Sequence, residues 1–172
     1  MKTITKTHKS FNELRSICNC VSKEKSKYVF SMNYLFVDET NVIGTNGKTM
    51  ACMKNVFGIG QGFWQVIKNT KSGIILAEPE EIKEDIGKFS KYQEVLDFDN
   101  GEPNIKAGHL TTDLSIDHFR LSQVGICIKI DQLAIFGGLD CDWFVVANDR
   151  PLHLFDKSKD YHAVLMPING VK

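Results

Sequence analysis

Apolar residues near the N-terminus recur with the spacing of a helix. Phe11, Leu14, Ile17, Cys18 and Val21 fall on one stripe, and polar residues occupy the opposite side. This pattern predicts a helix over residues 11–22. Ser10 stands at the N-cap position and Glu13 follows three residues later, which predicts a capping box at the start of this helix.

After the helix, the pattern changes to that of β-strands. Residues 28–37 are rich in aromatic and β-branched side chains, which indicates a strand. Asn46-Gly47 predicts a tight hairpin turn, because both residue types accept positive φ angles. Residues 63–67 and 74–77 predict two further strands, which form a long hairpin that extends the sheet.

The C-terminal third repeats the order of the first third. A strand over residues 124–130 is expected to lead into a short helix, 131–139, that Gly137-Gly138 ends. Three strands follow, at residues 143–147, 152–155 and 162–168. One supersecondary unit, strand–helix–three strands, therefore occurs twice.

Two segments carry a resemblance to a known family. Residues 42–51 (VIGTNGKTMA) and 161–168 (YHAVLMPI) resemble segments of the bacterial DNA sliding clamp, the β subunit of the replicative polymerase. The first is similar to a clamp strand that runs into a Thr-Asp-Gly turn. Asn46 replaces the usual Asp, and Lys48-Thr49 replaces a His-Arg pair. Residues 126–136 also resemble the second strand and helix of a clamp domain.

The resemblance implies an α+β, DNA-clamp-like fold. It has two βαβββ units, with two helices packed on one face of antiparallel sheets. Residues 1–172 would form a single clamp-like domain with a central insertion at about 58–121. Bacterial clamp subunits carry three such domains, so a ring of six domains would need about six copies of this chain.

In a clamp, helices line the hole and offer cations to DNA phosphates. The resemblance therefore implies a phosphate-contact set of Arg15, Lys23, Lys25, Lys27 and Lys48. Residues 23–27 are equally typical of a solvated turn. Two features weaken a DNA-encircling role: residues 131–139 contain no basic side chain, and the chain has room for only one clamp-like domain. Lys plus Arg equals Asp plus Glu at 21 each, which gives no global attraction to DNA but leaves room for a local basic patch.

The C-terminal segment implies a second site. In the resembled family it borders an apolar groove that captures short peptides from polymerases and repair proteins. The expected partner-binding residues are Val164, Met166, Pro167 and Ile168, although core packing also explains most of them.

No motif predicts catalysis, a metal site or a cofactor. The five cysteines are odd in number and scattered, which favours reduced thiols in a cytoplasmic protein. Glycine-rich residues 58–62 lack the Lys-Ser/Thr of a phosphate-binding loop, and residues 44–49 lack its first glycine at the required spacing. Asp140, Asp142, Asp149 and Asp156 would suit a metal-dependent nuclease, but turn chemistry accounts for each of them.

We therefore expect a non-enzymatic, sliding-clamp-like protein of DNA replication or repair, either a self-assembling DNA tether or a peptide-binding processivity factor. Its expected partners are double-stranded DNA, peptide motifs of polymerase or repair proteins, and further copies of itself. No membrane is expected among them, because no apolar run approaches the roughly 20 residues of a bilayer span. Two alternatives remain: an accessory or inhibitory clamp-fold protein, encoded by a host or by a phage, that does not encircle DNA, and a metal-dependent DNA-processing enzyme.

Overall fold

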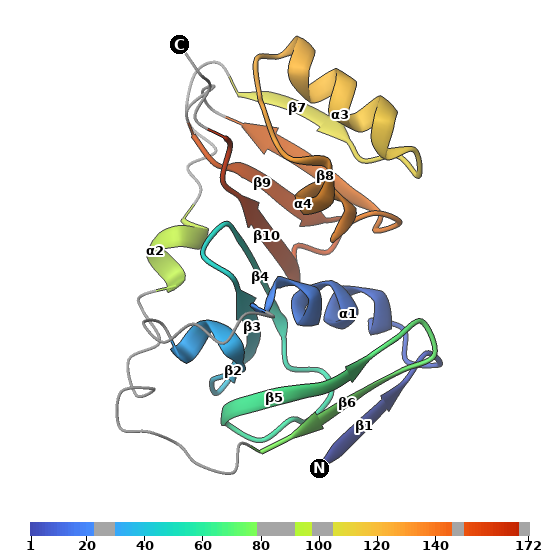
Figure 1. The fold of residues 1–172 in the computed structure, drawn as a ribbon, viewed down its shortest axis with the longest axis vertical. Coiled ribbons are helices and arrows are strands. Elements are labelled where there is room, and N and C mark those ends of the chain that lie inside the picture. The colour runs from blue at the N-terminus through green and yellow to red at the C-terminus, as the bar shows by residue number, and fades with distance from the viewer. Residues whose placement is uncertain (23–29, 79–91, 98–104, 146–149, 169–172) are drawn as a thin grey trace. The chain divides into compact units, whose positions relative to one another are not determined.

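The computed structural model describes residues 1–22, 30–78, 92–97, 105–145 and 150–168, which form two compact units (Figure 1). Unit 1 is Met1–Tyr92 and unit 2 is Gln93–Lys172. Unit 1 contains β1 (Lys2–Thr5), α1 (Phe11–Cys20), the 3-10 helix η1 (Phe30–Asn33), β2 (Leu35–Val37), β3 (Asn41–Thr45), β4 (Thr49–Lys54), β5 (Gly62–Asn69) and β6 (Gly73–Ala77). The short helix α2 (Tyr92–Leu96) leads into unit 2, which contains β7 (Lys106–His109), α3 (Leu114–Gln123), α4 (Ile130–Ala134), β8 (Cys141–Val145), β9 (Leu152–Asp156) and β10 (Tyr161–Leu165).

The sheet of unit 1 is antiparallel, with the strand order β1-β6-β5-β2-β3-β4. Helix α1 packs on β3, β4 and β5 and buries Leu14 and Ile17 completely. Gly44 allows this close approach, because a Cβ atom there would lie only 2.4 Å from the carbonyl oxygen of Ile17. The apolar stripe that the sequence predicts for α1 therefore packs directly on the sheet.

The predicted first helix is confirmed as α1, but its capping box does not form. The side chain of Ser10 makes no capping hydrogen bond, and its backbone N–H donates to Nδ1 of His8 at 3.2 Å. Glu13 is partly buried instead of reaching back to Ser10, and its Oε2 has no hydrogen-bond partner.

The predicted strand over residues 28–37 is much shorter than expected. Only β2 is a strand, and η1 occupies residues 30–33. The N–H of Ser22, just after α1, donates to the carbonyl of Met32 in η1 at 2.8 Å. Residues 23–29 lie outside the described residues.

Both predicted hairpins of unit 1 are confirmed. In the β3–β4 turn, Gly47 has a φ of 81°, and Oδ1 of Asn46 accepts from the N–H groups of Lys48 and Thr49, both at 2.9 Å. Strands β5 and β6 form the second hairpin, which extends the sheet from β2 to β1 and contains an irregularity between Val66 and Lys68.

The sheet of unit 2 is antiparallel, with the strand order β10-β9-β8-β7. Helices α3 and α4 pack against each other, and α3 runs beside β7 (Figure 1). Leu121 of α3 and Leu133 of α4 are fully buried, as are Phe136 and Leu154. These residues form the core of unit 2.

The sequence placed β8, β9 and β10 of unit 2 to within a few residues, but it missed β7 and the helices α2 and α3. The helix predicted over 131–139 is α4, which continues as turns to Gly138 with a φ of 84°. Residues 124–130 do not form the expected strand. Among the described residues, the segment after β10 contacts residues 124–130 through a backbone bond from the N–H of Ile168 to the carbonyl of Cys127 at 2.8 Å. Helix α3 was not predicted.

None of the helices in the described ranges has the length and apolar character needed to cross a bilayer.

Candidate functional site

One face of the unit 2 sheet carries a group of histidine, aspartate and phenylalanine side chains. Side chains of a strand alternate between the two faces, and the register brings together His109, Asp142, Phe144, His153, Phe155, His162 and Val164. We call this surface the histidine face. The opposite face carries the buried residues Cys141, Trp143, Leu154 and Ala163.

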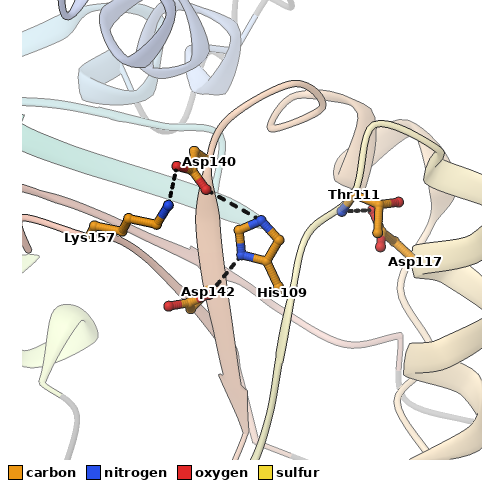
Figure 2. A network of polar contacts seen from close by, with 6 residues as sticks. All are labelled: His109, Thr111, Asp117, Asp140, Asp142 and Lys157. Carbon is orange, nitrogen blue, oxygen red and sulfur yellow. Dashed lines mark hydrogen bonds and ion pairs between the residues drawn. The ribbon is translucent and has the colours of Figure 1, made fainter.

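A polar cluster lies at the β7 end of the histidine face (Figure 2). Nδ1 of His109 lies 2.8 Å from Oδ1 of Asp142, and its Nε2 lies 3.3 Å from Oδ1 of Asp140. Lys157 places Nζ 2.7 Å from Oδ2 of Asp140. This hydrogen bond lowers the pKa of Asp140 and raises the pKa of Lys157. All four side chains are exposed enough for solvent to screen these contacts.

The geometry of this cluster does not suit a metal ion. Asp140 and Asp142 contact different nitrogens of the same ring, so their oxygens do not converge on one ring nitrogen. Across the described residues, no group of three His, Cys, Asp or Glu side chains is arranged to hold a metal.

Of the other two aspartates considered for a nuclease, only Asp156 lies among the described residues, and no described contact joins it to this cluster. Asp156 stabilises its own turn, because its carboxylate accepts from the hydroxyl of Ser158 and from the N–H of Tyr161. Asp149 lies outside the described residues.

Two histidines pair at the middle of the histidine face. Nδ1 of His153 lies 3.0 Å from Nε2 of His162, so one neutral ring donates and the other accepts. Burial lowers the pKa of His153 to about 4. Burial, with a further contribution from His153, lowers the pKa of His162 to about 3. The ring of Phe155 stacks on His162 with centroids 4.0 Å apart.

A cleft of about 380 Å³ opens beside these rings in unit 2. Phe144 and Phe155 line it with their centroids 5.8 Å apart in an edge-to-face arrangement. Its other lining residues are Leu96, Asp97, Asp142, Asp156, Lys157 and Lys159. The cleft therefore combines aromatic rings with charged side chains of both signs.

The expected phosphate contacts are only partly described. Arg15 lies on α1 and is half-buried, with an Nε atom that has no hydrogen-bond partner. Lys48 is exposed in the β3–β4 turn. No contact in the described residues brings these two cations together. Lys23, Lys25 and Lys27 fall outside the described residues.

The expected partner-binding residues differ among themselves in exposure. Val164 is fully buried in β10, whereas Met166 and Ile168 are each 44% exposed, and Pro167 is half-buried. The backbone bond from Ile168 to Cys127 fixes this segment beside the loop that precedes α4. Two apolar side chains are therefore held at the surface by the backbone.

Sequence reasoning missed His109, Phe144, Phe155 and Lys157 as members of one site. The period-2 alternation of side chains along the predicted strands 143–147 and 152–155 was a usable signal, and the register places Phe144 and Phe155 on the same face. His109 could not be placed in this way, because β7 was not predicted.

The comparisons with known proteins rest on structure alone. No protein-family model matches the sequence, and no curated protein does either. The β sliding clamp of Caulobacter crescentus matches with a TM-score of 0.58 and 11% identity, covering 98% of this chain and 65% of that one. The DNA polymerase III β subunits of Pseudomonas aeruginosa and Borrelia burgdorferi match with TM-scores of 0.52 and 0.51.

These two matches have identities of 9% and 14% and cover 98% of this chain; they span 67% and 64% of the respective β subunits. The chain thus spans about two thirds of the clamp subunits that it matches, slightly less than that for the C. crescentus and B. burgdorferi proteins. The chain has a sliding-clamp-like fold. The α+β, DNA-clamp-like architecture predicted from the sequence is confirmed, and the likeness at these identities concerns the fold.

Proposed function

We propose that this protein is a non-enzymatic, sliding-clamp-like factor of DNA replication or repair that acts in the cytoplasm. The observation that supports it is the structural match to bacterial sliding clamps along 98% of the chain. Fold alone does not fix function, so the proposal is developed from the surfaces of this chain.

The first proposed surface captures peptides. Met166 and Ile168 present apolar side chains at the end of β10, and Val164 anchors the strand beneath them. An exposed apolar pair on a fixed backbone suits an apolar anchor residue of a short peptide from a polymerase or repair protein.

The second proposed surface contacts double-stranded DNA through Arg15, Lys23, Lys25, Lys27 and Lys48. The chain has no net charge, so these local cations would have to provide the attraction. We propose that residues 1–172 act as one clamp-like domain in which about 58–121 is an insertion. Encircling DNA would then require assembly of several copies into a homo-oligomer.

Peptide capture is tested by fluorescence polarisation with a labelled pentapeptide that contains leucine and phenylalanine. We expect Met166→Ser with Ile168→Ser to weaken binding by about tenfold or more, because one buried apolar side chain contributes roughly 1.5–3 kcal/mol. Val56→Ser is the matched control, because Val56 is a 47% exposed apolar residue in unit 1. Equal affinities for all three proteins would contradict the peptide site.

DNA tethering is tested by sedimentation of the protein with a nicked circular duplex. A homo-oligomer that stays on the circle and leaves after linearisation would support the clamp. A monomer that binds the peptide but no DNA would instead support an accessory or inhibitory role. Magnesium-dependent cleavage that Asp142→Ala abolishes would support the enzyme alternative and end the proposal of a non-enzymatic factor.

A further inference from the structure

We propose that the cleft lined by Phe144 and Phe155 is a docking site for an arginine or lysine side chain of a partner protein. This cleft lies within unit 2 and shares no residue with the proposed peptide-binding or DNA-contact sets. The inference therefore stands whether or not the proposed clamp function holds.

The aromatic lining is the first support. The faces of aromatic rings carry negative partial charge and attract cations, including guanidinium and ammonium groups. Phe155 stacks on His162 at 4.0 Å and meets Phe144 edge-to-face at 5.8 Å. Since both rings have neighbours that hold them, a cation would meet a surface that is already formed.

The charge around the cleft is the second support. Asp97, Asp142 and Asp156 line it together with Lys157 and Lys159. Asp140 adjoins this lining through its 2.7 Å contact with Lys157. The described lining thus carries three carboxylates and two ammonium groups, an excess of one negative charge, and the Lys157 ammonium is already paired with Asp140.

This charge decides between classes of ligand. A nucleotide could stack on the same phenylalanines, but its phosphate would meet the excess of carboxylates. A guanidinium group would stack on a ring and donate hydrogen bonds to a carboxylate. Asp142 contacts His109 through Oδ1, and we assign Oδ2 of Asp142 and the carboxylate of Asp97 as the expected acceptors.

The size of the cleft fits a side chain with its neighbouring backbone. Binding pockets for small ligands run from about 300 to 1,000 Å³, and this one is about 380 Å³. One residue of a partner peptide is accordingly the expected occupant.

The experiment uses labelled nonapeptides of glycine and serine that differ only at the central residue. Arginine, lysine, norleucine and glutamate versions are titrated into the full chain, and chemical shifts of the phenylalanine rings are followed by NMR. We expect the arginine and lysine peptides to shift the ring signals and the other two to leave them unchanged. Asp97→Asn, at an exposed position, should weaken arginine binding by roughly two- to fivefold, as should Phe144→Leu.

Glu39→Gln is the matched control, because it removes a negative charge from an exposed position in unit 1 and should leave the affinity unchanged. The proposal would be overturned if the norleucine peptide bound as well as the arginine peptide, or if Asp97→Asn had no more effect than Glu39→Gln. Competition by a short single-stranded oligonucleotide with equal shifts of the ring signals would also overturn it. Since none of these readouts involves Met166, Ile168 or duplex DNA, failure here is distinguishable from failure of the proposed function.

Discussion

Each unit contains a strand glycine that another part of the same unit packs against closely. The two glycines differ in whether a helix backbone or an aromatic side chain makes this contact. At Gly44 in unit 1, a Cβ atom would lie 2.4 Å from the backbone oxygen of Ile17 in α1. At Gly108 in unit 2, it would lie 2.4 Å from the indole ring of Trp143. A backbone inside a helix cannot move alone, whereas a ring can rotate. The contact between helix and sheet in unit 1 should therefore tolerate change less well than the ring contact in unit 2.

The largest expected effect comes from Gly44→Ala. The added methyl group must push α1 away from β3 and β4, and we expect a loss of about 3 kcal/mol in the free energy of unfolding. Urea unfolding followed by the fluorescence of Trp64 measures this, because the two tryptophans of the chain are divided between the units. Trp143→Phe in the background removes the second signal.

Gly60→Ala is the control for that prediction. Gly60 is exposed, and the nearest atom to an added Cβ lies 3.7 Å away on the Trp64 ring. Its unfolding free energy should stay close to that of the parent. A Gly44→Ala protein no less stable than Gly60→Ala would show that α1 adjusts freely, and the comparison between the units would fail.

The second prediction extends the comparison to buried titratable groups. Burial raises the pKa of Cys20 and Cys52 in unit 1 to about 12, so these thiols stay neutral at acidic and neutral pH. In unit 2, burial lowers the pKa of His153 to about 4 and that of His162 to about 3. Mild acid, well above the pKa of the carboxylates, should therefore affect unit 2 more than unit 1.

The direction of this pH effect follows from proton binding. A histidine in the unfolded chain has a pKa of about 6.5. As the pH falls below this value, the unfolded chain binds protons that His153 and His162 do not bind in the folded protein. Stability is complete above pH 6.5 and falls as the pH drops toward 4. Between pH 7 and 5.5 we expect a loss of roughly 1 kcal/mol per histidine. Urea unfolding followed by Trp143 fluorescence, in a Trp64→Phe background, measures it.

His162→Gln sharpens this test, because glutamine does not titrate but keeps a hydrogen-bonding group near His153. The loss of stability between pH 7 and 5.5 should be about half as large as in the parent. A pH dependence that is unchanged in the His162→Gln protein would contradict the assignment to this pair.

Local patterns in the sequence predicted much of unit 1. The stripe of α1 and the turn at Asn46-Gly47 depend on neighbouring residues only, and both appear in the structure. Helix α3 was missed because its apolar residues do not mark its buried side. Ile116 and Phe119 are 44% and 62% exposed, while Asp117 is buried and accepts a hydrogen bond from the N–H of Thr111.

The candidate site depended on register, which no local pattern contains. Asp140 and Asp142 are close in the sequence, but the side chains that contact them come from distant positions. His109 lies about 30 residues before them and Lys157 about 15 residues after them. The strand pairing β7–β8 brings His109 opposite Asp142. Similarly, the exposure of Met166 and Ile168 follows from the end of β10 at Leu165, which the sequence placed three residues later.

The third prediction concerns the ring-covered glycine. Gly108→Ala should cost about 1 kcal/mol, less than Gly44→Ala, because the indole of Trp143 can rotate away from the new methyl group. Far-ultraviolet circular dichroism during urea unfolding gives the free energies without a tryptophan signal. In a double-mutant cycle, Trp143→Leu should remove most of the cost of Gly108→Ala. An undiminished cost in that background would place the strain in the backbone of β7, and the two glycines would then be equivalent.

The smallest effect on stability is expected at the surface of unit 2. Lys157 and Asp140 are solvent-exposed, and exposed ion pairs contribute little. Lys157→Met should therefore leave the urea midpoint unchanged, in contrast to both glycine substitutions. The same change removes one of the two ammonium groups that line the Phe144–Phe155 cleft. Affinity for the arginine peptide should then rise by about twofold at low salt and return toward the parent value as salt screens the carboxylates. A fall in affinity would show that Lys157 holds the side chains of the cleft in place, and that its role is not limited to repelling the cationic ligand.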